Sequence, residues 1–184
     1  MIILDDDEIL LKLRDERQRD AGFRLLISKY KVKLYHHIRR MVNDHEDTDD
    51  ILQNTFVKIF RGIDGFRETS SLYTWIYRIV TNETLTFIKI KNRRATDSLD
   101  ADDSRDVAGY MHNQRDLSAD DINDILVSAI GLLPEKQKLV FNLRYYDEMS
   151  YADMAEVTDT SEGALKASYH HAVKKIEEKL RNAV

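Results

Sequence analysis

Apolar residues recur every three or four positions along most of the chain, which is the spacing of one face of an α-helix. In residues 5–94 this pattern runs through three stretches, with breaks near Asn43 and at positions 62–65. It returns in residues 121–184, where Pro134 marks a restart because proline is tolerated in the first turn of a helix. The pattern predicts an all-α protein.

Residues 95–120 depart from this pattern, since acids are dense, large apolar residues are few and no period holds. Such a composition is typical of a segment that builds no core of its own. We therefore predict two small helical domains, residues 1–94 and 121–184, joined by a flexible acidic linker at 95–120. A solvated loop without any function explains the composition of residues 95–120 as well as a functional segment does.

The net charge of −5 is concentrated near that linker. Residues 1–94 carry 18 Lys and Arg against 15 Asp and Glu, residues 95–124 carry 2 against 9, and residues 125–184 carry 8 against 9. Each helical part can therefore present a basic face, and local patches matter more for binding a polyanion than the total charge does.

Several classes of protein are disfavoured by what the sequence omits. Without cysteine there are no disulfides, thiolate metal sites or cysteine nucleophiles. Acidic residues at the start and the lack of a long apolar run lead us to expect a cytoplasmic protein without membrane insertion. Because no catalytic or phosphate-binding motif is found, and the adjacent pairs His36-His37 and His170-His171 point about 100° apart on a helix, we expect no enzyme, cofactor or metal.

Residues 150–180 carry the sharpest pattern. Ser150 is placed to cap a short helix with Asp153 three residues on, residues 158–160 make a tight connection, and Ser161 is placed to cap a longer helix. This arrangement predicts a helix-turn-helix, whose second helix enters the major groove of DNA. The alternative is an ordinary helical hairpin. The residues that we expect to contact duplex DNA are Ser161, Lys166, Ala167, Ser168, His170, His171 and Lys174.

The N-terminal part combines cations with aromatic rings. Residues 24–40 include several basic residues and no acidic one, and a second basic run contains Lys89, Lys91, Arg93 and Arg94. Four aromatic residues lie between these two runs, namely Phe66, Tyr73, Trp75 and Tyr77. Cations neutralise phosphates while rings stack on unpaired bases, so this composition suits single-stranded DNA. Trp75 lies at helical spacing and fits a core equally well. Phe66 and Tyr73 flank a polar loop, and we expect them to be exposed.

Residues 46–50 are acidic at a helix start, where Asp47 or Thr48 is the expected N-cap. A second face of this helix, made of Asp50, Gln53, Asn54 and Val57, is either simply solvated or docks a partner.

These segments resemble the sigma factors of bacterial RNA polymerase. Residues 47–66 are similar to sigma region 2.2, with Asp50, Gln53 and Phe56 matching its D-x-x-Q-x-x-F pattern. Residues 65–94 look like region 2.3 and its neighbours, and residues 132–180 resemble region 4. Because both domains occur in order with none between them, the chain is identified as a member of the extracytoplasmic-function (ECF) group of the sigma-70 family.

The resemblance implies that the chain binds core RNA polymerase, recognises the −35 and −10 promoter elements and promotes DNA melting. The face with Asp50, Gln53, Asn54 and Val57 would bind the β′ coiled coil, and the helix after Pro134 would approach the β-flap. The helix-turn-helix residues above would read the −35 duplex. An anti-sigma factor is a further implied partner, and the chain would be monomeric when alone. The −10 strand would be held, with one base flipped out, by Phe66, Arg67, Thr69, Ser70, Tyr73, Trp75, Arg78, Asn82, Lys89, Arg93 and Arg94.

The sequence departs from the family pattern at the recognition helix. Ser168 and His171 stand where arginine is usual, and Asp159 replaces the turn glycine. Fewer fixed cations should weaken −35 binding. A plain helix-turn-helix regulator is the alternative reading of the whole chain, but a duplex reader has no need of the aromatic and basic block at 66–94.

Overall fold

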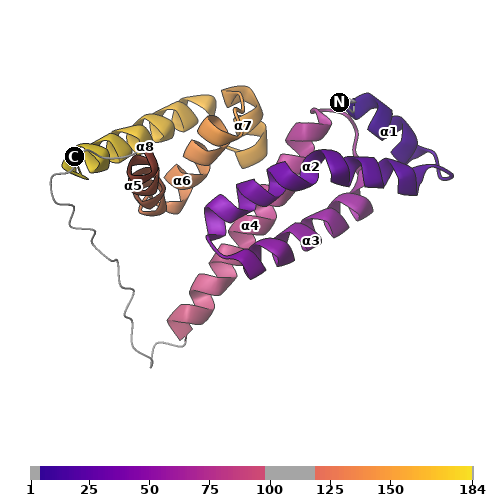
Figure 1. Cartoon of the computed structure of the whole chain (residues 1–184). Helices are drawn as coiled ribbons and strands as arrows, with labels where there is room; N and C mark the ends of the chain where they lie inside the picture. Colours follow the sequence, from indigo (N-terminus) through magenta and orange to yellow (C-terminus); the bar gives the residue numbers. More distant parts are fainter. Residues whose placement is uncertain (1–4, 98–118, 184) are drawn as a thin grey trace.

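A computed structural model describes residues 5–97 and 119–183, and within them it contains helices, turns and bends without β-strands. The all-α prediction is confirmed (Figure 1). The N-terminal half comprises α1 (Asp6–Arg14), α2 (Arg19–Val42), α3 (His45–Gly62), the 3-10 turn η1 (Ile63–Gly65) and α4 (Leu72–Asp97). The C-terminal half comprises α5 (Ala119–Gly131), α6 (Glu135–Phe141), the π-helical turn η2 (Asn142–Tyr146), α7 (Tyr151–Thr158) and α8 (Glu162–Ala183).

The start of α3 differs from the expectation. Its N-cap is Asp44, whose carboxylate accepts a hydrogen bond from the backbone N–H of Asp47 at 2.9 Å. That bond holds the pKa of the Asp44 carboxyl below its usual value. The predicted caps Asp47 and Thr48 are therefore wrong. Asn43, the residue directly after α2, adopts the left-handed conformation (φ 57°), and the chain turns there so sharply that α3 already begins at His45.

The caps of the C-terminal half follow the prediction. The Ser150 hydroxyl accepts from the backbone N–H of Asp153 at 3.1 Å, and that of Ser161 accepts from Ala164 at 3.4 Å. Asp159 adopts the left-handed conformation (φ 50°) that closes α7. Pro134 is the exception, since it lies at the N-cap of α6 and not in its first turn. After α6 the backbone widens into η2, where the N–H of Asp147 bonds to the carbonyl of Asn142, five residues back.

The N-terminal half packs α2, α3 and α4 side by side, with α1 across the start of α2. Its interior is mostly aliphatic, with the rings of Tyr30 and Tyr77 also buried, and it is filled by residues such as Leu26, Leu34, Ile38, Ile59, Ile76 and Val80. Helices α1 and α2 approach closely at Gly22, where an added Cβ would lie 2.9 Å from the backbone nitrogen of Leu13. The C-terminal half has a smaller core between α5, α6 and α8.

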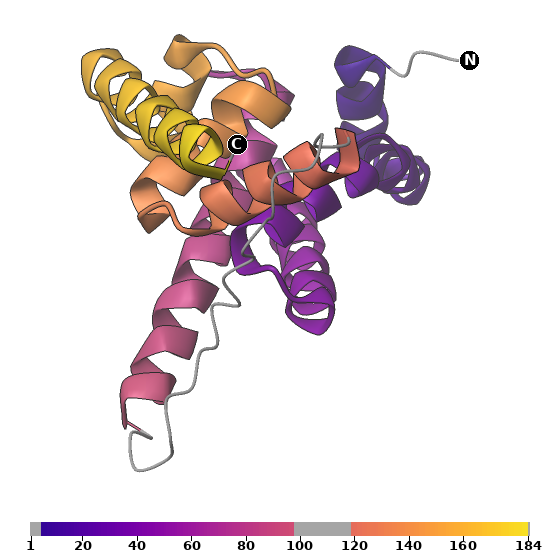
Figure 2. The same ribbon diagram turned by 60° about the vertical axis from the view of Figure 1, so that its left-hand side comes forward.

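The two halves are joined by a shared apolar core. Leu139, Val140, Leu143, Met154 and Val157 from the C-terminal half belong to one continuous buried cluster with the core of α1–α4. Helix α7 lies along the first part of α4, while α6 and η2 rest on α2. The last turns of α4 project beyond the other helices (Figure 2). No helix in the described residues is long and apolar enough to span a membrane.

Candidate nucleic-acid interface

Helices α7 and α8 place the predicted duplex-reading residues on one surface. Leu165, Ala172 and Ile176 bury the inner face of α8. On the outer face Lys166, Ala167, His170, His171 and Lys174 are exposed at helical spacing, as is Ser161 just before the helix, whereas Ser168 is half-buried. The ammonium of Lys166 lies 3.1 Å from Glu162 and 5.4 Å from the ring centre of Tyr151. The sequence reasoning therefore located a continuous exposed face.

The loop between η1 and α4 differs from the expectation at Phe66. Its side chain is only 8% exposed, and its ring lies 5.2 Å from that of Trp75. The predicted exposure of Phe66 is wrong because the 3-10 turn folds the ring back onto α4. Around this pair Arg67 and Thr69 are exposed and Ser70 is half-buried.

The loop is tied to the body of the N-terminal half. Glu68 adopts a left-handed backbone (φ 56°), and its carboxylate pairs with Arg14 of α1. Ser71 accepts a hydrogen bond from the backbone N–H of Thr74 at the start of α4. The polar loop therefore presents its side chains from a fixed backbone.

Two predicted −10 residues are engaged by the C-terminal half. The Tyr73 hydroxyl donates to the backbone carbonyl of Asp147 at 3.1 Å, and the Arg78 guanidinium donates to the carbonyl of Glu156 at 2.8 Å. Burial raises the pKa of Tyr73 to about 12, so its hydroxyl remains a donor at neutral pH. The predicted exposure of Tyr73 is therefore wrong, because its ring is half-buried against the C-terminal half, and no local pattern indicated this contact.

The remaining −10 candidates lie further along α4. Asn82 is exposed in the middle of the helix, and Lys89, Arg93 and Arg94 are exposed on its projecting end (Figure 2). Lys91 pairs there with Asp47 of α3. The projecting end of α4 therefore carries exposed basic side chains on more than one side of the helix.

The predicted partner face of α3 is exposed as a unit. Asp50, Gln53, Asn54 and Val57 all reach solvent, and Val57 is 41% exposed although it is apolar. The opposite side of α3 carries the buried residues Ile51, Leu52, Thr55 and Ile59. A single exposed apolar residue is ordinary on a protein surface, so a protein contact at this face stays a prediction.

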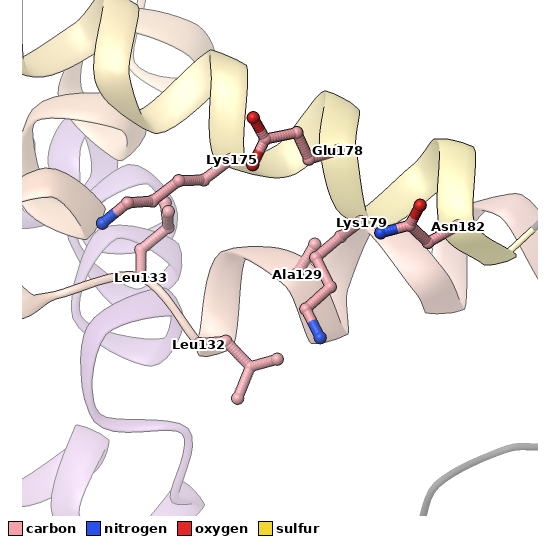
Figure 3. A pocket seen from close by; sticks show the side chains of 7 residues that line it. All are labelled: Ala129, Leu132, Leu133, Lys175, Glu178, Lys179 and Asn182. Atoms are coloured by element: carbon pink, nitrogen blue, oxygen red, sulfur yellow. The ribbon is translucent and has the colours of Figure 1, made fainter.

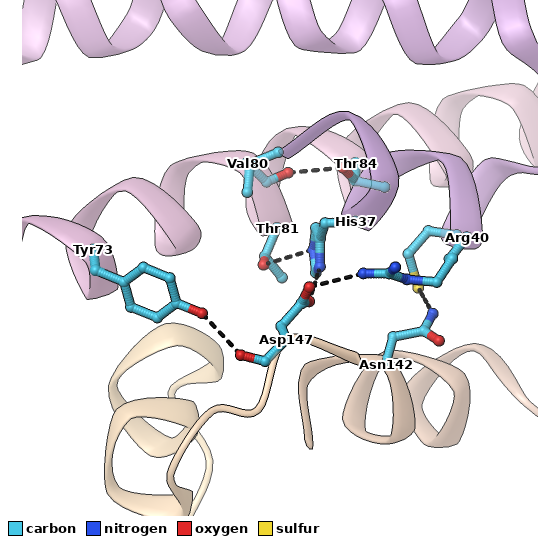
Figure 4. Close-up of polar contacts among 9 residues, drawn as sticks. His37, Arg40, Tyr73, Val80, Thr81, Thr84, Asn142 and Asp147 are labelled. Atoms are coloured by element: carbon cyan, nitrogen blue, oxygen red, sulfur yellow. Dashed lines mark hydrogen bonds and ion pairs between the residues drawn. The ribbon is translucent and has the colours of Figure 1, made fainter. Parts of the chain in front are cut away.

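Sequence reasoning missed a cluster that joins the two halves, made of His37, Arg40 and Asp147 and named here the Asp147 cluster. The two carboxylate oxygens of Asp147 lie 2.7 Å from Nδ1 of His37 and 2.8 Å from the Arg40 guanidinium (Figure 4). The side chain of His37 is fully buried and that of Asp147 is 4% exposed. His37 and Asp147 are 110 residues apart, so no local pattern could have paired them.

A shallow hollow of about 210 Å³ lies between the end of α5 and α8 (Figure 3). Ala129, Leu132 and Leu133 make its apolar side, and α8 contributes Lys175, Glu178, Lys179 and Asn182. It adjoins Pro134 and the start of α6, the segment that is expected to approach the β-flap. No residue predicted to contact DNA lines this hollow.

Comparison with known proteins gives matches to both halves. Residues 26–95 match the model of Sigma-70 region 2, and residues 123–176 match that of Sigma-70, region 4. The ECF RNA polymerase sigma-E factor of Haemophilus influenzae is 29% identical over 182 residues, covering 95% of both chains. The RNA polymerase sigma-H factor of Pseudomonas aeruginosa is 30% identical over 189 residues, covering 98% of this chain and 97% of that one.

Solved structures share the fold. CnrH, in its complex with the cytosolic domain of CnrY, superposes with a TM-score of 0.67 at 19% identity, covering 97% of this chain and 99% of that one. The sigma factor RpoE of Bartonella quintana, in complex with the anti-sigma factor NepR, gives 0.69 at 21% identity, covering 86% and 96%. With two family models in order and a relative at 30% identity over nearly its whole length, the chain belongs to the ECF group of the sigma-70 family, and it is a transcription initiation factor rather than an enzyme.

Proposed function

We propose that this chain binds core RNA polymerase, recognises the −35 and −10 elements of a promoter and promotes melting of the DNA. One observation carries the proposal. A helix with an exposed reading face, α8, lies in one half of the chain, and α4, which has an aromatic pair at its start and exposed cations at its far end, lies in the other. A duplex reader and a single-strand binder are thereby available together.

The −35 element would be read by α8. Its small residues, Ala167 and Gly163, let the helix backbone approach the major groove closely. Lys166 and Lys174 supply charge for phosphates or guanine, and the side chains of Ser168, His170 and His171 can hydrogen-bond to base edges. Two exposed lysines and no arginine on this face support modest affinity that depends on salt.

The −10 element would be held by the loop and α4. Flipping a base out of the stack costs a few kcal/mol, which contacts in a pocket must offset. Because Phe66 is buried against Trp75, the pair forms a fixed apolar wall, and the exposed residues Arg67 and Thr69 are the groups that reach the base or its phosphate. Lys89, Arg93 and Arg94 would neutralise the strand further along α4.

Core polymerase would be bound by the face of α3 that holds Asp50, Gln53, Asn54 and Val57, as the coiled coil of β′ requires in the family. The segment around Pro134 would meet the β-flap. An anti-sigma factor is a further proposed partner. The sigma factor RpoE was solved in complex with the anti-sigma factor NepR, and CnrH was solved in complex with the cytosolic domain of CnrY. We propose 1–94 and 121–184 as the two working domains.

Gel filtration with purified core polymerase tests the first step without DNA. The wild-type chain should elute with core, and Asp50→Lys should elute alone because it reverses a charge on the contact face. Asp49→Lys is the matched control, since Asp49 is exposed and points about 100° away on the same helix. Equal elution of the two variants would refute the assigned face.

Run-off transcription with core polymerase on a library of genomic fragments tests the whole proposal. Defined transcripts should depend on added chain, and their start sites would reveal the −35 and −10 sequences. A chain that elutes with core and yet yields no transcript from any fragment would contradict promoter recognition.

A further inference from the structure

The corner between α1 and α2 runs from Arg14 to Arg19 and lies against the segment between α3 and α4, residues 63–71, named here the −10 loop (Figure 1). Both arginines pair with an acid of this loop. The Arg14 guanidinium pairs with the carboxylate of Glu68, and the Arg19 guanidinium lies 2.8 Å from the carboxylate of Asp64. The corner therefore holds the −10 loop at two separate points.

The corner is itself held in one conformation. Within it, the carboxylate of Asp15 accepts hydrogen bonds from the backbone N–H of Arg17 at 3.0 Å and from the side-chain amide of Gln18 at 2.8 Å. Directly before it, α1 packs on α2 so closely at Gly22 that an added Cβ would lie 2.9 Å from the backbone of α1. The two arginine side chains therefore extend from a fixed backbone.

Arg19 also reaches the end of α3. Its guanidinium donates to the backbone carbonyl of Phe60 at 3.3 Å and lies 5.1 Å from the centre of the Phe60 ring. The side chain of Arg19 is 27% exposed, compared with 58% for that of Arg14. Arg19 thereby joins the start of α2 to the end of α3 and, through Asp64, to η1.

Glu68 depends on its partner because its backbone conformation is unfavourable. It is left-handed (φ 56°), which residues other than glycine adopt rarely and keep only where surrounding contacts hold them. Among the described residues the Glu68 carboxylate has one ion pair, with Arg14. Its neighbours in sequence, Arg67 and Thr69, are the exposed groups proposed to reach the base or its phosphate. The direction of these two side chains therefore depends on the pair at Glu68.

We propose that the two arginines of the corner are positioning residues for the −10 strand, because they fix the backbone from which Arg67 and Thr69 extend. Neither arginine contacts DNA in this role. Helix α1, for which the sequence predicted no function, thereby contributes to the −10 surface. The effect on DNA rests on the proposed function, whereas the hold of the corner on the loop does not and can be measured on the chain alone.

Release of the loop can be followed by hydrogen exchange of single amides, measured by NMR on the full chain. The N–H of Phe66 donates to the carbonyl of Ile63 at 3.1 Å, so its exchange rises with the fraction of chain whose loop is released. Arg14→Glu replaces the pair by two like charges. Because loss of an exposed pair alone changes an equilibrium by roughly 1.4- to 5-fold, exchange at Phe66 should rise at least about twofold. Exchange at Ile38, buried in α2, should not change.

Matched variants isolate the two pairs. Arg17→Glu makes the same change of charge at the same corner, and among the described residues the Arg17 side chain has no ion pair. Arg14→Glu with Glu68→Arg restores opposite charges and should recover the wild-type exchange, whereas Arg17→Glu with Glu68→Arg, of equal net charge, should not. Asp64→Lys tests the second pair from its exposed side and should also raise exchange at the loop, with the exposed Glu16→Lys as its control.

The DNA arm uses holoenzyme formed with core polymerase, on a promoter obtained by run-off transcription. All variants should elute with core in gel filtration, because none lies on the proposed contact face of α3. Arg14→Glu should lose permanganate reactivity of the promoter thymines, whereas Arg17→Glu should keep it. Arg14→Glu with Glu68→Arg should regain the reactivity, a recovery that an arginine contacting DNA directly would not give.

Each arm can overturn the proposal. Equal exchange at Phe66 in Arg14→Glu and Arg17→Glu, in Asp64→Lys and Glu16→Lys, or a rise that Ile38 shares, would overturn the hold of the corner on the loop. A released loop with unchanged thymine reactivity, or a swap variant that recovers its exchange and not its reactivity, would overturn the positioning role. A wild-type chain that yields no transcript would instead refute the proposed function and leave the exchange results standing.

Discussion

Lys166 offers a quantitative test of the duplex-reading face. Its side chain is 56% exposed near the start of α8 and pairs with Glu162 one turn away. An exposed pair of this kind is worth only about 0.3–0.5 kcal/mol, so it yields readily to a phosphate. Each phosphate neutralised on duplex DNA adds about 0.9 to the slope of log affinity against log salt. Lys166→Ala should therefore lower the slope by about 0.9.

The expected difference is large enough to measure. Between about 50 and about 200 mM salt, a slope of 0.9 amounts to roughly 3.5-fold in affinity, so the wild type should lose about that much more than Lys166→Ala. Anisotropy on a random-sequence duplex suffices, because a phosphate contact does not depend on the promoter. Lys179→Ala is the control, since Lys179 is exposed on the same helix about 20 Å further on. An unchanged slope for Lys166→Ala, or an equal loss for Lys179→Ala, would refute this placement of the DNA.

Three further predictions concern stability. Gly22→Ala should lower the free energy of unfolding by about 1–3 kcal/mol relative to Gly163→Ala, because both variants gain helix propensity but only the Cβ at position 22 would lie 2.9 Å from backbone. Denaturant unfolding measures the difference, and equal free energies for the two variants would contradict the close approach of α1 and α2. Ser150→Ala should lower the free energy of unfolding by about 1 kcal/mol through loss of the α7 cap, as read from the circular-dichroism midpoint, and no loss would refute the cap. Burial raises the pKa of Tyr73 to about 12 and raises that of Tyr77 as well. The folded protein therefore keeps the full stability that these neutral phenols contribute below pH 10.0 and should lose it as the pH rises from 10.0 to about 12. A melting temperature that stays constant across that range would contradict their burial.

Local patterns were enough to predict most helices and caps. The apolar spacing that marks α2, α3 and α8 is set by burial of one helix face, and Ser150 and Ser161 cap their helices through bonds spanning three residues. The error at the start of α3 is also local. Asp44, Asp47 and Thr48 are all capable caps, and the choice depended on whether Asn43 would take the left-handed turn.

The orientation of Phe66 and the Asp147 cluster lay beyond local reasoning. Polar neighbours suggested that Phe66 faces water, but the turn at Ile63–Gly65 directs the ring onto Trp75. Apolar spacing likewise indicated that residues such as Leu143 and Met154 are buried without saying against what. They pack in one cluster with the N-terminal core. Apolar spacing shows that a residue is buried but does not show which segment covers it, so it could not reveal the contact between the halves.

The π-helical turn at Asn142–Tyr146 lets the chain change its length by one residue at this point. A widened turn holds one residue more than an α-helical turn over the same stretch. Deleting one of its residues would allow a regular α-helical turn, while Asp147 would keep its direction toward His37 and Arg40. A one-residue gap placed here in an alignment of related chains would thus mark the loss of the widened turn, with the residues on either side still in register.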